Sequence, residues 1–145
     1  MENLITKDIV SRLMDKLECR QKLICTFLGI TETTLSMNIE KPLSEITHTK
    51  TGKRLYSLLW VVSALSTDET ITPKVLVRIL TSPHFEMEDG TVMDVIAGIR
   101  SDFSPSYLVK IAEEALKYFR EKYQSVPKRD EFLQKVTSIY SEQHA

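Results

Sequence analysis

Apolar side chains recur every three to four residues through most of the chain, and this period predicts α-helices. In the first segment, Thr6 is suited to cap a helix that covers residues 7–18. The broadest apolar surface lies on residues 52–65, after the expected cap Thr51, so we expect a central core helix there. Its apolar positions are Leu55, Leu58, Leu59, Val62 and Leu65.

Two pairs of a hydroxyl residue and a proline mark further helix starts. Thr72-Pro73 and Ser104-Pro105 each place a capping side chain before a proline at the first helical position, where the missing N–H costs nothing. They predict a helix that begins at Pro73 and a long helix over residues 105–124. The other segments are expected to form a loop over residues 40–50, a short helix or turn over residues 91–99, and a last helix over residues 128–140.

These elements predict an all-α fold, a helical bundle with an N-terminal helix-turn-helix and a C-terminal helical extension. We expect residues 1–66 to form the helix-turn-helix bundle with its covering helix, and residues 67–145 to pack against it as part of one body. Only four glycines and five prolines occur, which fits helices better than a turn-rich sheet protein. No apolar run approaches the roughly 18 residues of a membrane span, so we expect no membrane partner.

The helix-turn-helix is predicted by an uninterrupted pattern from Arg20 to Ile39. Two short helices, residues 20–28 and 32–39, flank Gly29, which can adopt the left-handed backbone that ends a helix. Thr31 is suited to cap the second helix, and an acidic residue follows it in the first turn. Any two helices joined by a glycine could share part of this pattern, but its length without a gap favours a helix-turn-helix.

The same segment resembles the Xre-type repressor family. Gln21, the turn at residues 28–31 and the run at residues 34–36 match the family's second helix, turn and recognition helix. In that family the recognition helix lies in the major groove, and the glutamine near the start of the second helix typically contacts a phosphate. The resemblance and the neighbouring basic residues together give an expected DNA-binding set of Gln21, Lys22, Thr31, Glu32, Thr33, Thr34, Met37, Lys41, Lys53 and Arg54.

The order of segments also resembles the Xre/MbcA/ParS group of antitoxins. Residues 53–59 are similar to the start of that group's long helix, and residues 77–85 and 89–96 are similar to its C-terminal block. The resemblance implies an antitoxin that represses its own operon and binds a toxin through its C-terminal half. A palindromic operator would be bound by a homodimer.

Charge argues for a second hypothesis. The net charge is −1, and no Arg or Lys lies between Lys22 and Lys41, so the expected recognition helix lacks the commonest base-reading side chain. Glu32 adds a negative charge where phosphates would pass. The alternative is therefore a helical adaptor that keeps the helix-turn-helix architecture and binds proteins instead of DNA, with the basic residues forming an ordinary solvated surface.

No pattern indicates an enzyme, a cofactor site or a metal site. The chain has no glycine-rich phosphate loop, and its histidines, His48, His84 and His144, are isolated from one another. Cys19 and Cys25 would lie on different faces of one helix, so we expect two reduced thiols. With no secretion signal at the N-terminus, we expect a cytoplasmic protein.

Overall fold

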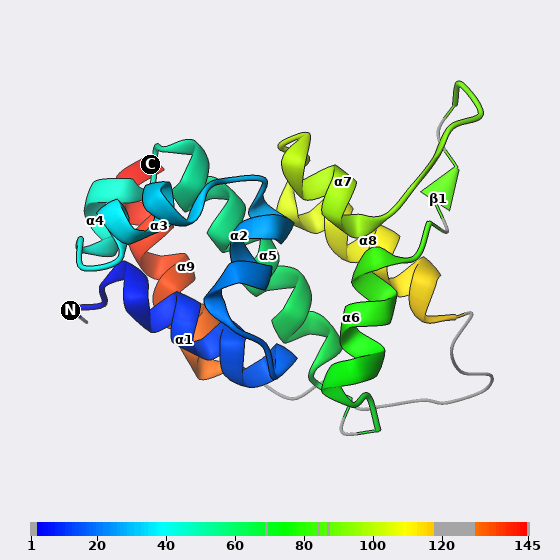
Figure 1. Cartoon of the computed structure of the whole chain (residues 1–145), viewed down its shortest axis with the longest axis horizontal. Coiled ribbons are helices and arrows are strands. Elements are labelled where there is room, and N and C mark those ends of the chain that lie inside the picture. Colours follow the sequence, from blue (N-terminus) through cyan, green and yellow to red (C-terminus); the bar gives the residue numbers. More distant parts are fainter. Residues whose placement is uncertain (1–2, 69, 84, 87, 118–129, 145) are drawn as a thin grey trace.

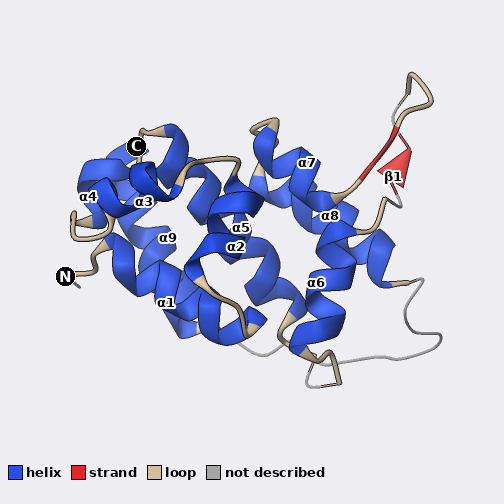
Figure 2. Cartoon of the chain, in the orientation of Figure 1, coloured by secondary structure: helices blue, strands red, loops and turns tan. Residues whose placement is uncertain are grey.

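The computed structural model describes residues 3–68, 70–83, 85–86, 88–117 and 130–144. Helices dominate this part of the chain, and a small hairpin is the only strand pair in it (Figure 2). The all-α prediction is therefore confirmed. The elements are α1 (Thr6–Leu17), α2 (Gln21–Leu28), α3 (Glu32–Asn38), α4 (Leu43–Ile46), α5 (Lys50–Leu65), α6 (Pro73–Thr81), β1 (Phe85–Glu86), β2 (Val92–Met93), α7 (Val95–Arg100), α8 (Pro105–Leu116) and α9 (Glu131–His144).

Helix α5 is the centre of the molecule, as its broad apolar surface predicts. It runs between the other helices in Figure 1 and packs against α1, α2, α4, α7, α8 and α9. Its leucines and valines are almost completely buried, with Leu65 the most exposed of the predicted set at 3%. One core cluster combines side chains from α1 through α9, so residues before and after position 66 share the same apolar interior.

Most helix starts lie where the capping residues predict them. Thr31, Thr72 and Ser104 each accept a hydrogen bond from the backbone N–H three residues later. Asp94 caps α7 in the same way, so the expected short helix of residues 91–99 begins only after strand β2. The β1–β2 hairpin projects from the helical body beside α7 (Figure 1), with Phe85 paired to Met93 and Glu86 to Val92.

Two predicted caps are wrong. Thr6 lies inside α1 and is buried, because Ile5 takes the extended cap position and pairs with Pro42. The Asp8 carboxylate accepts the Ile5 N–H at 2.8 Å and completes that helix start. Helix α5 is capped by Thr49 and not by Thr51, since the Thr49 hydroxyl accepts the Gly52 N–H at 3.0 Å.

Other boundaries also differ from the sequence expectation. The expected loop of residues 40–50 contains the short helix α4, whose Leu43 and Ile46 are fully buried. The last helix extends from Glu131 to His144, beyond the expected end at residue 140. Residues 118–124 of the expected long helix, and residues 128–129 of the last one, lie outside the described residues.

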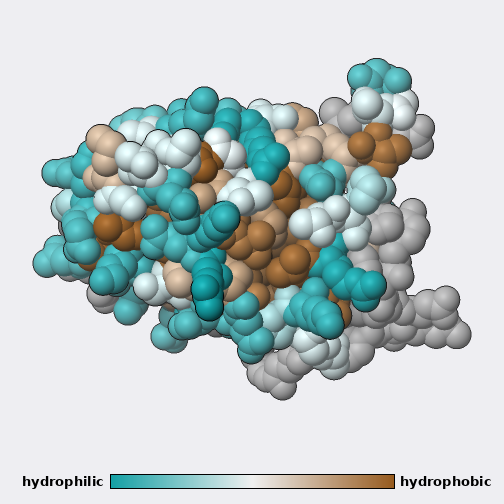
Figure 3. All heavy atoms as spheres, in the orientation of Figure 1, coloured by the Kyte–Doolittle hydropathy of each residue, from teal (hydrophilic) through white to brown (hydrophobic). Residues whose placement is uncertain are grey.

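The surface of the molecule is largely hydrophilic. On the face drawn in Figure 3, polar side chains surround a smaller apolar area near the middle. Within the described residues, the exposed large apolar side chains are Met37, Val92 and Tyr107. No helix in that part of the chain is long and apolar enough to cross a membrane.

Candidate nucleic-acid interface

The turn between α2 and α3 has the backbone geometry that the sequence pattern predicts. Gly29 adopts φ 67° and ψ 37°, a left-handed conformation that costs glycine little. The N–H of Ile30 then bonds to the Cys25 carbonyl at 3.1 Å, and the Gly29 N–H bonds to the Thr26 carbonyl at 3.2 Å. These bonds satisfy the last carbonyls of α2 and direct the chain into α3.

Helix α3 is fixed on its inner side by apolar contacts and at its start by a cap. Leu35 is fully buried, and Ile39 packs at the edge of the core. The Thr31 hydroxyl accepts the Thr34 N–H at 3.0 Å and lies 2.9 Å from the Thr34 hydroxyl. Both hydroxyls are therefore used within the helix cap, which leaves them less free to bond a base than the sequence suggests.

The outer face of α3 is open to solvent. Glu32, Thr33 and Ser36 are exposed, and the Met37 side chain is 71% exposed. Asn38 is half-buried and donates its side-chain amide to the Thr34 carbonyl at 2.8 Å. We refer to Glu32, Thr33, Ser36 and Met37 as the outer face of α3. The DNA-binding set expected from the sequence does not include Ser36, although Ser36 lies three residues after Thr33 and therefore beside it on the helix.

The predicted flanking residues occupy different environments. Lys22 on α2 and Lys41 after α3 are exposed, whereas Gln21 at the start of α2 is half-buried. The Lys41 carbonyl accepts the Thr6 N–H at 2.9 Å, which fixes the backbone after α3 against the start of α1. Lys53 is exposed too, but it lies on α5 beside a pocket.

Arg54 does not belong to the DNA-binding set that the sequence suggested. Its side chain is buried and donates three hydrogen bonds within the protein. Nη1 bonds to the Leu28 carbonyl at 2.8 Å, Nη2 bonds to the Arg100 carbonyl at 2.7 Å, and Nε lies 3.1 Å from the Asp102 carboxylate. A guanidinium with these partners is held away from solvent, so the prediction that Arg54 contacts a phosphate is wrong for this fold.

Arg100 is the residue near the turn that sequence reasoning missed. It is exposed at the end of α7, and its guanidinium donates to the Thr26 carbonyl in the last turn of α2. Its side-chain carbons lie 3.3 Å from the point where a Cβ on Gly29 would stand. No local signal reveals this cation, because it lies far from the turn in the sequence and only the packing of α7 against α2 brings it there.

The two cysteines near the turn have thiols with raised pKa values. Burial raises the pKa of the Cys25 thiol, and the nearby Glu32 carboxylate raises it further. Burial likewise raises the pKa of the Cys19 thiol. Both cysteines are free thiols, as the sequence predicts, and their raised pKa values favour the less reactive protonated form. Among the described residues, no group of three or more His, Cys, Asp or Glu side chains could hold a metal ion.

The arrangement therefore offers one short exposed helix that bears hydroxyl, carboxylate and thioether groups, with lysines before and after it. Such a surface can contact a groove or another protein, and it contains no nucleophile paired with a base. Comparisons with protein-family models, with curated proteins and with solved structures found no match to this chain.

Proposed function

We propose that the chain is a DNA-binding regulator that places α3 in the major groove. The observation that carries the proposal is the outer face of α3, which is held by the Gly29 turn and the Thr31 cap and is covered by no other described element. The Thr33 hydroxyl is suited to a base edge, and the exposed Met37 is suited to a thymine methyl group. Lys22 and Lys41 supply backbone phosphate contacts.

The resemblance of residues 53–59, 77–85 and 89–96 to antitoxins supports a wider proposal. In it, the chain represses its own operon and binds a toxin through elements that follow α5. A regulator of this kind binds a palindromic operator as a homodimer. It acts in the cytoplasm, where its free thiols stay reduced.

A direct test measures the affinity of the full chain for the DNA just upstream of its own gene and for a shuffled duplex of equal length. The titrations are repeated across a salt series. A regulator prefers the upstream DNA, and its affinity falls steeply with salt because phosphate contacts release counterions. Equal affinity for the two duplexes at low salt would overturn the proposal.

Variants of the outer face assign the contacts. Thr33→Ala combined with Met37→Ala is expected to reduce the preference for the upstream DNA by about tenfold, because base contacts carry the discrimination. Lys22→Met or Lys41→Met should lower both affinities alike and reduce the salt slope by about 1. Lys110→Ala combined with Glu113→Ala, two exposed changes on α8, is the matched control. Unchanged discrimination in the first variant would place base recognition on another surface.

A second function, a protein-binding adaptor, is favoured by the chemistry of the same face. The outer face of α3 carries Glu32 and no cation, and Met37 is its most exposed side chain. Methionine adapts well to apolar protein partners. If the adaptor function holds, the upstream DNA is not preferred, and the product of the adjacent gene co-purifies with the wild-type chain but not with the Thr33→Ala, Met37→Ala variant.

A further inference from the structure

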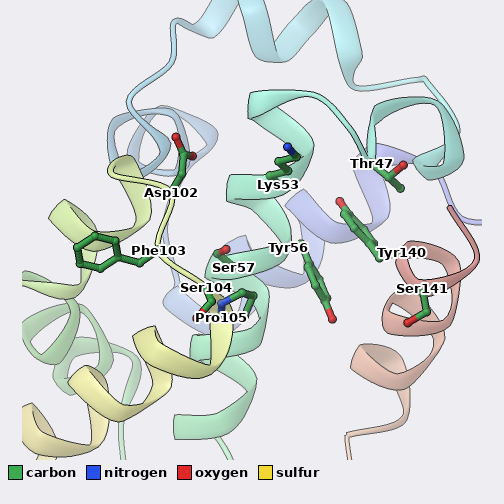
Figure 4. Close-up of a pocket in the computed structure, with 10 residues that line it drawn as sticks. All are labelled: Thr47, Lys53, Tyr56, Ser57, Asp102, Phe103, Ser104, Pro105, Tyr140 and Ser141. Atoms are coloured by element: carbon green, nitrogen blue, oxygen red, sulfur yellow. The ribbon is translucent and has the colours of Figure 1, made fainter. Parts of the chain in front are cut away.

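A pocket of about 350 Å³ opens beside α5, between α9 and the loop that precedes α8. Figure 4 shows its three sides: α5 in the middle, the loop from Asp102 to Pro105 on one side, and α9 with Tyr140 and Ser141 on the other. This volume lies at the lower end of the range for small-molecule sites.

The wall formed by α5 and α9 is flat and aromatic. The Tyr56 and Tyr140 rings are stacked, with centroids 4.3 Å apart and an interplanar angle of 16°. Both hydroxyls are engaged away from the ring faces: Tyr140 donates to the Gly52 carbonyl at 2.7 Å, and the Tyr56 hydroxyl lies 3.2 Å from the Thr137 hydroxyl. Pro105 lies on the opposite side of Tyr56 from Tyr140 (Figure 4). A flat apolar ring fits between such surfaces.

The polar lining contains a serine whose hydroxyl has no partner. Ser57 is only 7% exposed and lines the pocket, and its hydroxyl has no hydrogen-bond partner among the residues that the structure describes. A hydroxyl with no partner in the protein is free to donate a hydrogen bond to an occupant of the pocket. Lys53 lies four residues earlier on α5 and therefore projects from the same face of the helix.

The charges of the lining favour an occupant with a single negative charge. Lys53 is exposed and has no ion pair within the described residues. The other charged side chain of the lining, Asp102, is 3.1 Å from the Arg54 guanidinium and is balanced by it. With Asp102 paired to Arg54, Lys53 is the one charge of the described lining without an ion pair, and a single cation suits a singly charged carboxylate better than a dianionic phosphate.

We propose that this pocket binds a small aromatic carboxylate. The ring lies between the Tyr56–Tyr140 wall and Pro105, and the carboxylate accepts hydrogen bonds from the Lys53 ammonium and the Ser57 hydroxyl. The site lies on α5, α9 and the loop before α8, so it is separate from the outer face of α3 and does not depend on DNA binding.

The test is a titration of the ¹⁵N-labelled full chain with 2-naphthoate, without DNA, followed by backbone amide shifts. We expect saturable shifts that cluster at residues 53–57 and 102–104. The neutral isostere 2-naphthamide should bind about tenfold more weakly, because it loses the charged hydrogen bond. Equal affinity for the two probes would overturn the proposal, as would shifts scattered over the surface or no shift at millimolar probe.

Two variants assign the polar contacts, and a third controls for charge. Lys53→Met should weaken 2-naphthoate by about tenfold and leave 2-naphthamide unchanged, and Ser57→Ala should weaken 2-naphthoate by about threefold. Lys50→Met removes an exposed lysine from the same helix outside the pocket and should bind both probes as the wild type does. If Lys50→Met and Lys53→Met weaken 2-naphthoate equally, the effect is one of overall charge and the assigned site is wrong. The amide spectra report directly whether each variant is folded.

Discussion

Arg54 joins three segments of the chain through one guanidinium. Its acceptors are the Leu28 carbonyl at the end of α2, the Arg100 carbonyl at the end of α7, and the Asp102 carboxylate in the next loop. Carbonyls at helix ends have no partner within their own helix and carry partial negative charge. The guanidinium donors are spread over three nitrogens of a rigid plane and so reach acceptors on three sides, whereas the three donors of a lysine ammonium lie on one atom.

Replacing Arg54 with methionine is therefore expected to lower the free energy of unfolding by about 2–4 kcal/mol, because buried acceptors lose their donors. Arg54→Lys should recover only part of that loss. The measurement is urea unfolding followed by circular dichroism. Lys53→Met, at the exposed neighbouring position, should change stability by less than about 0.5 kcal/mol. A loss at Arg54 no larger than at Lys53 would show that the three bonds contribute little.

Gly29 is constrained by its backbone and by a neighbour. At φ 67°, a β-branched side chain is strained, and a Cβ would also meet the Arg100 side chain at 3.3 Å. We expect Gly29→Val to cost about 2 kcal/mol of stability, and Gly29→Asn, which tolerates this backbone better, to cost about half as much. Thermal unfolding of the two variants tests the ranking. Equal losses would mean that side-chain crowding, and not the left-handed backbone, limits this position.

Between elements, α4 approaches the backbone of α5 closely at Gly52. A Cβ on Gly52 would stand 1.8 Å from the Ile46 carbonyl oxygen, so only glycine allows the end of α4 to lie against the first turn of α5. Gly52→Ala is expected to destabilise the protein by about 3 kcal/mol, the upper part of the usual range for overpacking.

Gly98→Ala is a useful comparison for that variant. A Cβ on Gly98 would meet the end of the Leu108 side chain at 2.6 Å, and a side chain can move more easily than a backbone carbonyl. Chemical unfolding of both variants should therefore show the smaller loss for Gly98→Ala. The reverse order would indicate that the α4–α5 corner can shift at little cost.

The elements themselves were largely predictable from the sequence, since most depend on neighbouring residues. The Gly29 turn, the Thr72-Pro73 start and the Ser104-Pro105 start are local signals, and the apolar period shows which face of each helix is buried. Thr6 and Thr51 failed as caps because a better-placed neighbour, fixed by contacts with other segments, took that position.

The candidate sites were less predictable than the helices. The burial of Arg54 and the position of Arg100 depend on how α7 packs against α2, and no spacing in the chain encodes that approach. The pocket likewise combines residues from α5, the loop before α8, and α9. Pairs so distant in sequence are brought together only by the packing of whole helices.

At the scale of the whole molecule, the last helix, α9, packs against helices from the N-terminal half of the chain. It packs against α4 and α5, and the Tyr140 hydroxyl donates to the Gly52 carbonyl at 2.7 Å. Figure 1 shows α9 behind α1, on the same side of the molecule as α3 and α4. The Arg12 guanidinium also lies over the Phe132 ring, 5.0 Å from its centroid, so the last helix is attached to the first one as well.

This attachment predicts a loss of stability in alkaline solution. Burial raises the pKa of Tyr140 above its ordinary value of 10.0, and the nearby Tyr56 raises it further. The folded state therefore holds the Tyr140 hydroxyl proton more tightly than the unfolded state does. The contribution of this proton to the free energy of unfolding is fully present below pH 10 and is lost as the pH rises above 10.

Unfolding free energies measured from pH 8 to pH 11 should show this loss in the wild type. Tyr140→Phe should be less stable by about 1 kcal/mol at pH 8, because the hydrogen bond is absent, and should lose less stability as the pH rises. Parallel curves for the two proteins would show that another group causes the alkaline loss.

The hydrogen bonds at the end of α2 form at different stages of synthesis, because their donors lie far apart in the sequence. Two of the last carbonyls of that helix, those of Leu28 and Thr26, accept hydrogen bonds from the side chains of residues 54 and 100, and Arg54 also bonds to Asp102. A ribosome releases the N-terminal helices long before residue 102 emerges, so the bonds made by Arg100 and Asp102 form only after most of the chain has been made. A truncated chain that ends before residue 100 would keep Arg54 but lose the Arg100 bond to the Thr26 carbonyl and the Asp102 partner of Arg54, so we expect α2 and α3 to be less stable in it than in the full chain.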